Sequence, residues 1–223
     1  MDFTNPHVVN QLLTMLNYQK QLNDVFDPQW RTNRHQYLRA VVVEGGEAID
    51  HHGYKWWKKQ VKDLAQMQLE VVDILHFYLS EVARLNLDND EAVLREEWLK
   101  DERVVRFDEQ NYLISRLSTL EKFELIIGLA VSRRMSWSLF RAIQEDVELD
   151  FAALHHQYAA KNVLNLLRQR HGDKQGTYIK VWEGEEDNIH LSRQMEIWAE
   201  DETMDVLYAR LEALYKTLAL KRD

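Results

Sequence analysis

The sequence contains no cysteine, and its 223 residues include only seven glycines and two prolines. Without cysteine the chain has no disulfide bridge, no thiolate metal site and no cysteine nucleophile. Both prolines lie within the first 28 positions, so the rest of the chain lacks the residue that breaks helices most strongly. This scarcity argues against the many tight turns of an all-β fold and favours an all-α protein.

Long hydrophobic runs are also absent, since no segment approaches the roughly 18 to 20 apolar residues that a membrane-spanning helix needs. The N-terminus has no basic stretch ahead of an apolar core, which is unlike a secretory signal peptide. Basic residues are in the minority, because 37 acidic residues outnumber 28 basic ones and the formal net charge is -9. We therefore expect a soluble, cytoplasmic protein with no membrane partner and no nucleic acid partner.

Apolar residues that recur every three or four positions predict amphipathic helices along most of the chain. The predicted helices cover residues 8–23, 33–53, 58–84, 91–101, 119–132, 136–146, 150–170 and 203–220. The second and third are expected to form an antiparallel hairpin at the centre of a helical bundle, with Gly53 ending the second helix. Residues 171–188 have no sustained period and are interpreted as a long ordered loop. We expect one domain that spans residues 1–223.

Two pairs of carboxylates lie on this predicted hairpin. Glu44 and Glu47 are three positions apart on its first helix, and Glu70 and Asp73 are three apart on its second, so each pair shares one helix face. The valines beside both pairs indicate that the acids face the hairpin interface rather than solvent. Burying four negative charges requires compensating cations, and an all-oxygen ligand set favours Mg²⁺, with Mn²⁺ as a substitute.

Two glycines, Gly45 and Gly46, interrupt the first helix between its acids. Each costs a helix about 1 kcal/mol relative to alanine, which suggests that something approaches the backbone closely there. A single E-x-x-E pair is more often a solvated surface pattern than a metal site. Two pairs on adjacent helices, flanked by valines and interrupted by glycines, favour the metal site.

Two functions of other classes remain open at this stage. Asp73 and His76 have the spacing of a carboxylate and a histidine in di-iron carboxylate bundles, and Asp187 with His190 is the second such match in the chain. A di-iron oxidase is therefore an alternative, although its second pair lies at the end of the predicted loop. A purely structural helical module would need none of these acids.

Several blocks of sequence resemble a known family. They are E-G-G-E at 44–47, E-V-V-D at 70–73, D-P-Q-W-R at 27–31, H-G-Y-K-W-W-K at 52–58 and the long run at 158–188. The two acidic blocks resemble the metal-binding motifs of the all-α NTP pyrophosphatase superfamily, and the whole set resembles the dimeric dUTPases. The matching blocks cover roughly residues 12–80 and 155–190.

This resemblance implies hydrolysis of dUTP, and also of dUDP, to dUMP by attack of water on the α-phosphorus, with pyrophosphate leaving from dUTP. Glu44, Glu47, Glu70 and Asp73 would hold roughly two or three Mg²⁺ ions per site. Glu44, with Glu47 as its rival, would orient or deprotonate the water. A pyrophosphatase for another nucleotide, such as dCTP or a damaged dNTP, is the alternative within the same chemistry.

The resemblance also assigns the substrate contacts and the assembly. The base and sugar would meet Gln19, Asn23, Trp56, His76, Phe77 and Asn188, and the phosphates would meet Lys161, Arg168, Lys174 and Lys180. A homodimer is implied, with residues 91–155 as a mobile or dimer-forming helical subregion. Outside the resemblance, Phe77 is as well explained by core packing and the basic residues by a solvated face. The chain departs from the family pattern at Asp173, where an aromatic residue usually follows the glycine.

Overall fold

The computed structural model describes residues 3–199 and 202–219. Its α-helices are α1 (Pro6–Phe26), α2 (Tyr37–His52), α3 (Leu64–Leu85), α4 (Asp90–Leu99), α5 (Thr119–Val131), α6 (Trp137–Asp146), α7 (Phe151–Arg170), α8 (Asp187–Met195) and α9 (Met204–Leu214). The prediction of an all-α fold is confirmed. No described helix is both long and apolar enough to cross a membrane.

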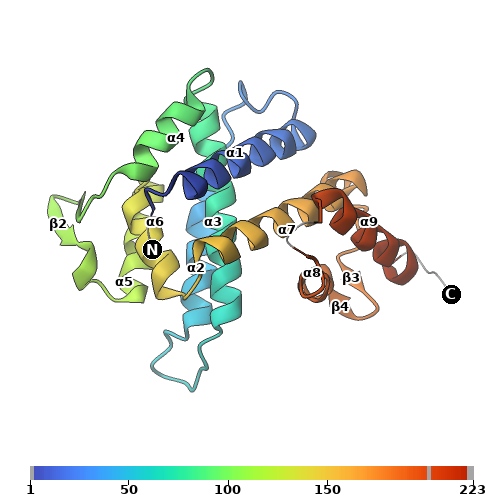
Figure 1. Ribbon diagram of the computed structural model, residues 1–223. Helices are drawn as coiled ribbons and strands as arrows, with labels where there is room; N and C mark the ends of the chain where they lie inside the picture. Colours follow the sequence, from blue (N-terminus) through green and yellow to red (C-terminus); the bar gives the residue numbers. More distant parts are fainter. Residues whose placement is uncertain (1–2, 200–201, 220–223) are drawn as a thin grey trace.

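Helices α2 and α3 form an antiparallel pair at the centre of the molecule, as predicted (Figure 1). Helices α4, α5 and α6 flank this pair on one side, and α1 crosses it. Helix α7 packs along α1 and α3 and extends beyond the bundle, so its C-terminal half also contacts α8 and α9. The long helix α7 therefore joins the central bundle to a smaller C-terminal group of helices.

The ends of the central pair follow ordinary capping rules. Helix α2 ends at Gly53, which has a left-handed backbone with φ of 82°, as the sequence predicts. Helix α3 begins at Leu64, where Asp63 caps the backbone N–H of Gln66 at 3.1 Å. The predicted start at residue 58 was wrong, because the lysine-rich residues 55–62 have no continuous apolar face to bury.

A β-hairpin interrupts the subregion at residues 91–155, which was expected to be helical. Strands β1 (Val104–Phe107) and β2 (Gln110–Leu113) pair antiparallel. Asp108 and Glu109 make the two-residue turn with φ of 46° and 60°, and such turns usually carry Asn-Gly or Asp-Gly. The sequence indicates a hairpin only weakly, because Asp108-Glu109 occupies the turn in place of a glycine-containing pair.

Residues 171–188 are more structured than the predicted loop. A short 3-10 turn at Asp173–Gln175 is followed by the strands β3 (Val181–Trp182) and β4 (Glu185–Glu186), and α8 already begins at Asp187. Trp182 anchors the segment, because its ring is fully buried against the C-terminal helices. The predicted C-terminal helix is observed as α9 and a π-helical turn at Tyr215–Ala219; its predicted last residue, 220, lies outside the described residues.

Candidate active site

A cavity of about 590 Å³ lies between α1, α3 and α7, and Tyr37 and Glu44 of α2 also line it. This volume is in the range of small-molecule sites. Many of its lining residues are polar or aromatic, and they include Gln19, Asn23, Glu44, Asp73, His76, Phe77, Ser80, Lys161, Asn165, Arg168 and Lys174. Helices α1, α3 and α7 each contribute residues three or four positions apart, so the cavity is formed where polar faces of otherwise apolar helices meet.

Three carboxylates cluster at the α2 edge of this cavity. Ligand atoms of Glu44, Glu47 and Glu70 all lie within 4.8 Å of one another. Glu70 is buried, Glu44 is half-buried and Glu47 is exposed, so the expectation that all the acids turn away from solvent was wrong for Glu47. His51 Nε2 lies 3.5 Å from Glu70 Oε1 at the outer side of the cluster.

The acids of the cluster hold protons more tightly than isolated carboxyls do. Burial, together with the charges of Asp73 and Glu47, raises the pKa of Glu44 to about 7. Burial, together with Asp73 and Glu44, raises the pKa of Glu70 to about 8. Because Glu44 and Glu70 also hydrogen-bond to each other, the metal-free cluster retains a proton near neutral pH, as crowded acids without a cation do.

Two of the expected phosphate-binding residues are paired with acids. Lys161 Nζ lies 2.8 Å from Asp73 Oδ2, and this lysine is 6% exposed. Arg168 donates through Nε and Nη2 to the two oxygens of Asp187, each at 2.8 Å. Burial acts to raise the pKa of Asp187, but the Arg168 guanidinium and the Tyr178 hydroxyl outweigh it and hold that pKa below its ordinary value.

The other end of the cavity is polar but uncharged. Gln19, Asn23, His76 and Ser80 are buried there and hydrogen-bonded to one another. Burial lowers the pKa of His76 to about 4, so its imidazole is neutral at physiological pH. The Tyr158 ring stacks on it with centroids 4.0 Å apart. This end can recognise a neutral polar group, whereas the carboxylate end could hold a metal ion.

Besides Glu47 and Glu70, which belong to the carboxylate cluster but not to the cavity lining, three expected site residues do not line the cavity. Trp56 is 90% exposed in the loop between α2 and α3, and Lys180 pairs with Glu186 at 3.2 Å on the surface. Asn188 lies in the first turn of α8 beside Asp187, and its enclosed Oδ1 has no hydrogen-bond partner. Asp173, the departure from the family pattern, does line the cavity and accepts a hydrogen bond from Gln169 at 3.2 Å.

Sequence reasoning missed three residues of the site, namely Ser80, Tyr158 and Asn165. Ser80 lies one turn beyond His76 on α3, and the other two lie one turn on either side of Lys161 on α7. The helical repeat alone would have placed them on the same faces as residues already identified. They were missed because serine, tyrosine and asparagine in a helix do not by themselves indicate a functional site.

The observed contacts do not support the di-iron alternative. Asp187 is bound to Arg168, and His190 Nε2 lies 3.1 Å from the Trp182 carbonyl oxygen. Neither residue lines the cavity that holds Asp73 and His76. Among the described residues, the one group of three or more clustered metal-ligating side chains contains glutamates only, which is an oxygen ligand set for a hard cation.

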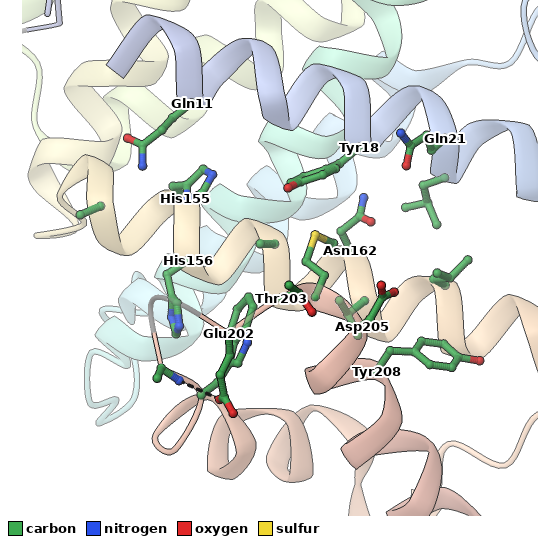
Figure 2. Close-up of a pocket in the computed structure, with 18 of the residues that line it drawn as sticks. Gln11, Tyr18, Gln21, His155, His156, Asn162, Glu202, Thr203, Asp205 and Tyr208 are labelled. Carbon is green, nitrogen blue, oxygen red and sulfur yellow. Dashed lines mark hydrogen bonds between the residues drawn. The ribbon is translucent and has the colours of Figure 1, made fainter. Parts of the chain in front are cut away.

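A larger cleft of about 1230 Å³ opens on another face of α7, between α1 and α9. Figure 2 shows Tyr18 on one wall, His155 and His156 on α7, and Glu202 and Asp205 on the opposite wall. Size alone would make it the first candidate for a ligand site. The carboxylate cluster and the buried neutral network both belong to the smaller cavity, however, so we place the chemistry there.

The sequence matches a family model for dUTPase over residues 11–172. This match includes most of α1, all of α2, α3 and α7, and every residue of the carboxylate cluster. No curated protein matches the chain.

Proposed function

Because the chain belongs to the dUTPase family, and is thus an enzyme of the dUTP diphosphatase type, we propose that it hydrolyses dUTP to dUMP and pyrophosphate with Mg²⁺. Water attacks the α-phosphorus, and the bond from that phosphorus to the oxygen bridging the β-phosphate breaks. The same attack on dUDP releases phosphate, so we include dUDP as a substrate. The observation that carries the proposal is one cavity with a carboxylate cluster at one end and a buried neutral polar network at the other.

The residues of the cluster fit magnesium. Glu44, Glu47 and Glu70 offer only oxygen ligands, and the raised pKa values of Glu44 and Glu70 are those of a site short of positive charge. Asp73 adds a fourth carboxylate one turn along α3. When bound, roughly two or three Mg²⁺ ions would clamp the phosphate oxygens and lower the pKa of a bound water; Mn²⁺ has the same ligand preference.

Glu44 is our choice for the residue that orients and deprotonates the attacking water. It belongs to the cluster and also lines the cavity, whereas Glu47 belongs to the cluster alone. A general base must lie within hydrogen-bond reach of the water from which it takes a proton, so it has to face the space where the substrate binds. Lys161 and Arg168 face the same space from α7, where their charges would offset the charge that develops on the leaving phosphates.

The neutral end of the cavity suits the uracil base. Gln19, Asn23 and His76 offer amide and imidazole groups for its polar edge, and Phe77 lies where it can pack against the deoxyribose. Lys174 stands at the rim, with its ammonium group donating to the Phe26 carbonyl at 2.9 Å. We keep a phosphate role for Lys174, while Lys180 and Asn188 would need to move to reach substrate.

We also propose that the enzyme works as a homodimer. The loop at residues 53–63 exposes Tyr54, Trp56, Trp57 and Val61, and a group of exposed apolar side chains is typical of a surface that another chain covers. Trp56 could then contact substrate only from the partner subunit or after the loop moves. Light scattering would give twice the monomer mass if this is right, and Trp57→Ala would weaken the association.

A panel of dUTP, dUDP, dCTP, dTTP and UTP with Mg²⁺, and with EDTA as the control, tests the proposed reaction. We expect preference for dUTP, with dUMP and pyrophosphate as products and no turnover in EDTA. Preference for dCTP or a damaged dNTP would retain the metal site and reject the uracil pocket. Turnover that survives EDTA would reject the metal site itself.

A further inference from the structure

The polar side chains at the neutral end form a closed chain of hydrogen bonds that begins and ends on His76. Ser80 Oγ donates to the His76 backbone carbonyl at 2.9 Å, and Asn23 Nδ2 donates to Ser80 Oγ at 3.1 Å. Gln19 Nε2 donates to Asn23 Oδ1 at 3.0 Å, and Gln19 Oε1 lies 2.6 Å from His76 Nδ1. All four side chains are buried, so water does not compete strongly for these bonds.

The donor-to-acceptor direction of these hydrogen bonds is set at the His76 carbonyl oxygen, because a backbone carbonyl can only accept a hydrogen bond. Ser80 Oγ has two acceptors within reach, the His76 carbonyl oxygen at 2.9 Å and Asn23 Oδ1 at 3.3 Å, and its one hydrogen goes to the nearer carbonyl, a common bond for a helical serine. The Ser80 oxygen then accepts from Asn23 Nδ2. The Asn23 amide must then turn its oxygen to Gln19. In the same way, the Gln19 amide must turn its oxygen to the His76 ring.

A carbonyl oxygen at 2.6 Å from Nδ1 requires that this nitrogen carries a hydrogen. The neutral His76 ring then has no hydrogen on Nε2, which becomes a hydrogen-bond acceptor. No described protein group bonds to Nε2. Tyr158 supports this arrangement, because its hydroxyl lies 2.7 Å from Gln19 Oε1 and 3.2 Å from the Met15 carbonyl oxygen and donates to the nearer of the two, while its ring stacks on the imidazole.

We propose that Ser80 is a positioning residue for base selection. Through Asn23 and Gln19, it fixes the His76 tautomer in which Nε2 accepts a hydrogen bond. The site therefore binds pyrimidines that carry a hydrogen on N3. Uracil carries this hydrogen, whereas N3 of cytosine is itself an acceptor. Cytosine N3 placed opposite His76 Nε2 would leave two buried acceptors without a hydrogen between them, and binding sites strongly reject such mismatches. This inference rests on the proposed function, because it presumes a pyrimidine nucleotide in the cavity.

Ser80→Ala removes the hydroxyl that sets the orientation of the Asn23 amide, so the side-chain amides of Asn23 and Gln19 can each exchange the positions of their oxygen and nitrogen. We expect the ratio of kcat/KM for dUTP over dCTP to fall about tenfold or more, with the loss for dUTP mostly in KM. The ¹⁵N shifts of His76 at neutral pH should move from the Nδ1–H tautomer toward a mixture. Ser80→Thr keeps the hydroxyl and should restore both the ratio and the ¹⁵N shifts.

Thr14→Ala is the matched control, because Thr14 makes the same kind of bond to a helix carbonyl, to Asn10 at 2.9 Å, but is exposed. It should change neither readout. An unaltered tautomer and ratio in Ser80→Ala would overturn the inference, as would an Nε2–H tautomer in the unaltered protein. If the unaltered enzyme does not hydrolyse dUTP, the proposed function fails, and the ¹⁵N shifts alone still decide whether Ser80 fixes the tautomer.

Discussion

Folding and the proposed reaction place opposite requirements on the ionisation of Glu44 and Glu70. They hydrogen-bond to each other inside a cluster of acids, and burial with neighbouring charge raises the pKa of both. Crowded carboxylates destabilise a folded chain when they ionise, yet the proposed reaction needs them as ligands. The balance between folding and function at these residues depends on a bound cation.

The first prediction concerns Glu70→Gln, which removes one of the clustered charges and leaves the side-chain volume nearly unchanged. We expect turnover to fall by about two orders of magnitude or more, because a ligand to the metal is lost. The midpoint of thermal unfolding in EDTA should stay the same or rise. Glu124→Gln, on the exposed side of α5, should change neither quantity, and full activity in Glu70→Gln would reject the ligand assignment.

The second prediction concerns pH. Folding raises the pKa of Glu44 from 4.5 to about 7 and that of Glu70 from 4.5 to about 8, so the folded chain binds more protons than the unfolded chain between pH 4.5 and 8. In EDTA, the contribution of this pair to stability should therefore decline as pH rises through that window. Mg²⁺ should raise the unfolding temperature most at its upper end. Thermal melts across this range, on the protein and on Glu70→Gln, would show whether the slope belongs to this pair.

Helix α2 contains two adjacent glycines with different surroundings. A Cβ added at Gly45 would lie 2.7 Å from Ile127 Cγ1 on α5, whereas a Cβ at Gly46 would meet nothing within 4 Å. The sequence suggested a close approach to the backbone at both positions. A protein side chain approaches Gly45 alone, and it comes from the neighbouring helix α5.

This difference predicts opposite results for two alanine substitutions. Gly45→Ala should lower the free energy of unfolding by about 1–3 kcal/mol, because Ile127 and α5 must shift. Gly46→Ala should raise it by about 0.5–1 kcal/mol, since alanine favours the helix and nothing obstructs its methyl group. Urea titrations measure both, and equal effects would show that α2 and α5 are not packed this closely.

The buried apolar residues of the described chain form two clusters, one in the central bundle and one among α8, α9 and the end of α7. They meet on α7, where Tyr158 belongs to the first cluster and Ala159 to the second. Because one continuous helix contributes buried residues to both clusters, unfolding of either cluster removes packing that holds α7 in place for the other. The ion pair of Arg168 with Asp187 adds a polar link between α7 and α8.

We therefore expect the chain to unfold as one domain. The near-ultraviolet signal of Trp182 in the second cluster should be lost at the same urea concentration as the far-ultraviolet signal of the whole chain. Trp182→Phe, compared with the unaltered protein, identifies the contribution of that ring. Two separated transitions would instead divide the chain near the middle of α7.

Much of this protein could be predicted from local pattern. The periodicity of apolar residues located most of the helices, Gly53 marked the end of α2, and the spacing of Glu44 with Glu47 and of Glu70 with Asp73 indicated two acidic helix faces. These features depend on residues within one or two turns of each other, so the sequence determines them without knowledge of the rest of the fold.

Tertiary structure decided which of these groups meet. Lys161 reaches Asp73 across 88 positions of sequence, and Asn23 reaches Ser80 across 57. Spacing along one helix could not show that Asp73 pairs with a lysine, or that burial and neighbouring acids raise the pKa of Glu44 and Glu70. The pKa of a carboxyl depends on the charges and burial that packing brings to it. For the same physical reason the sequence determined the faces of the helices, and only their packing determined the chemistry between those faces.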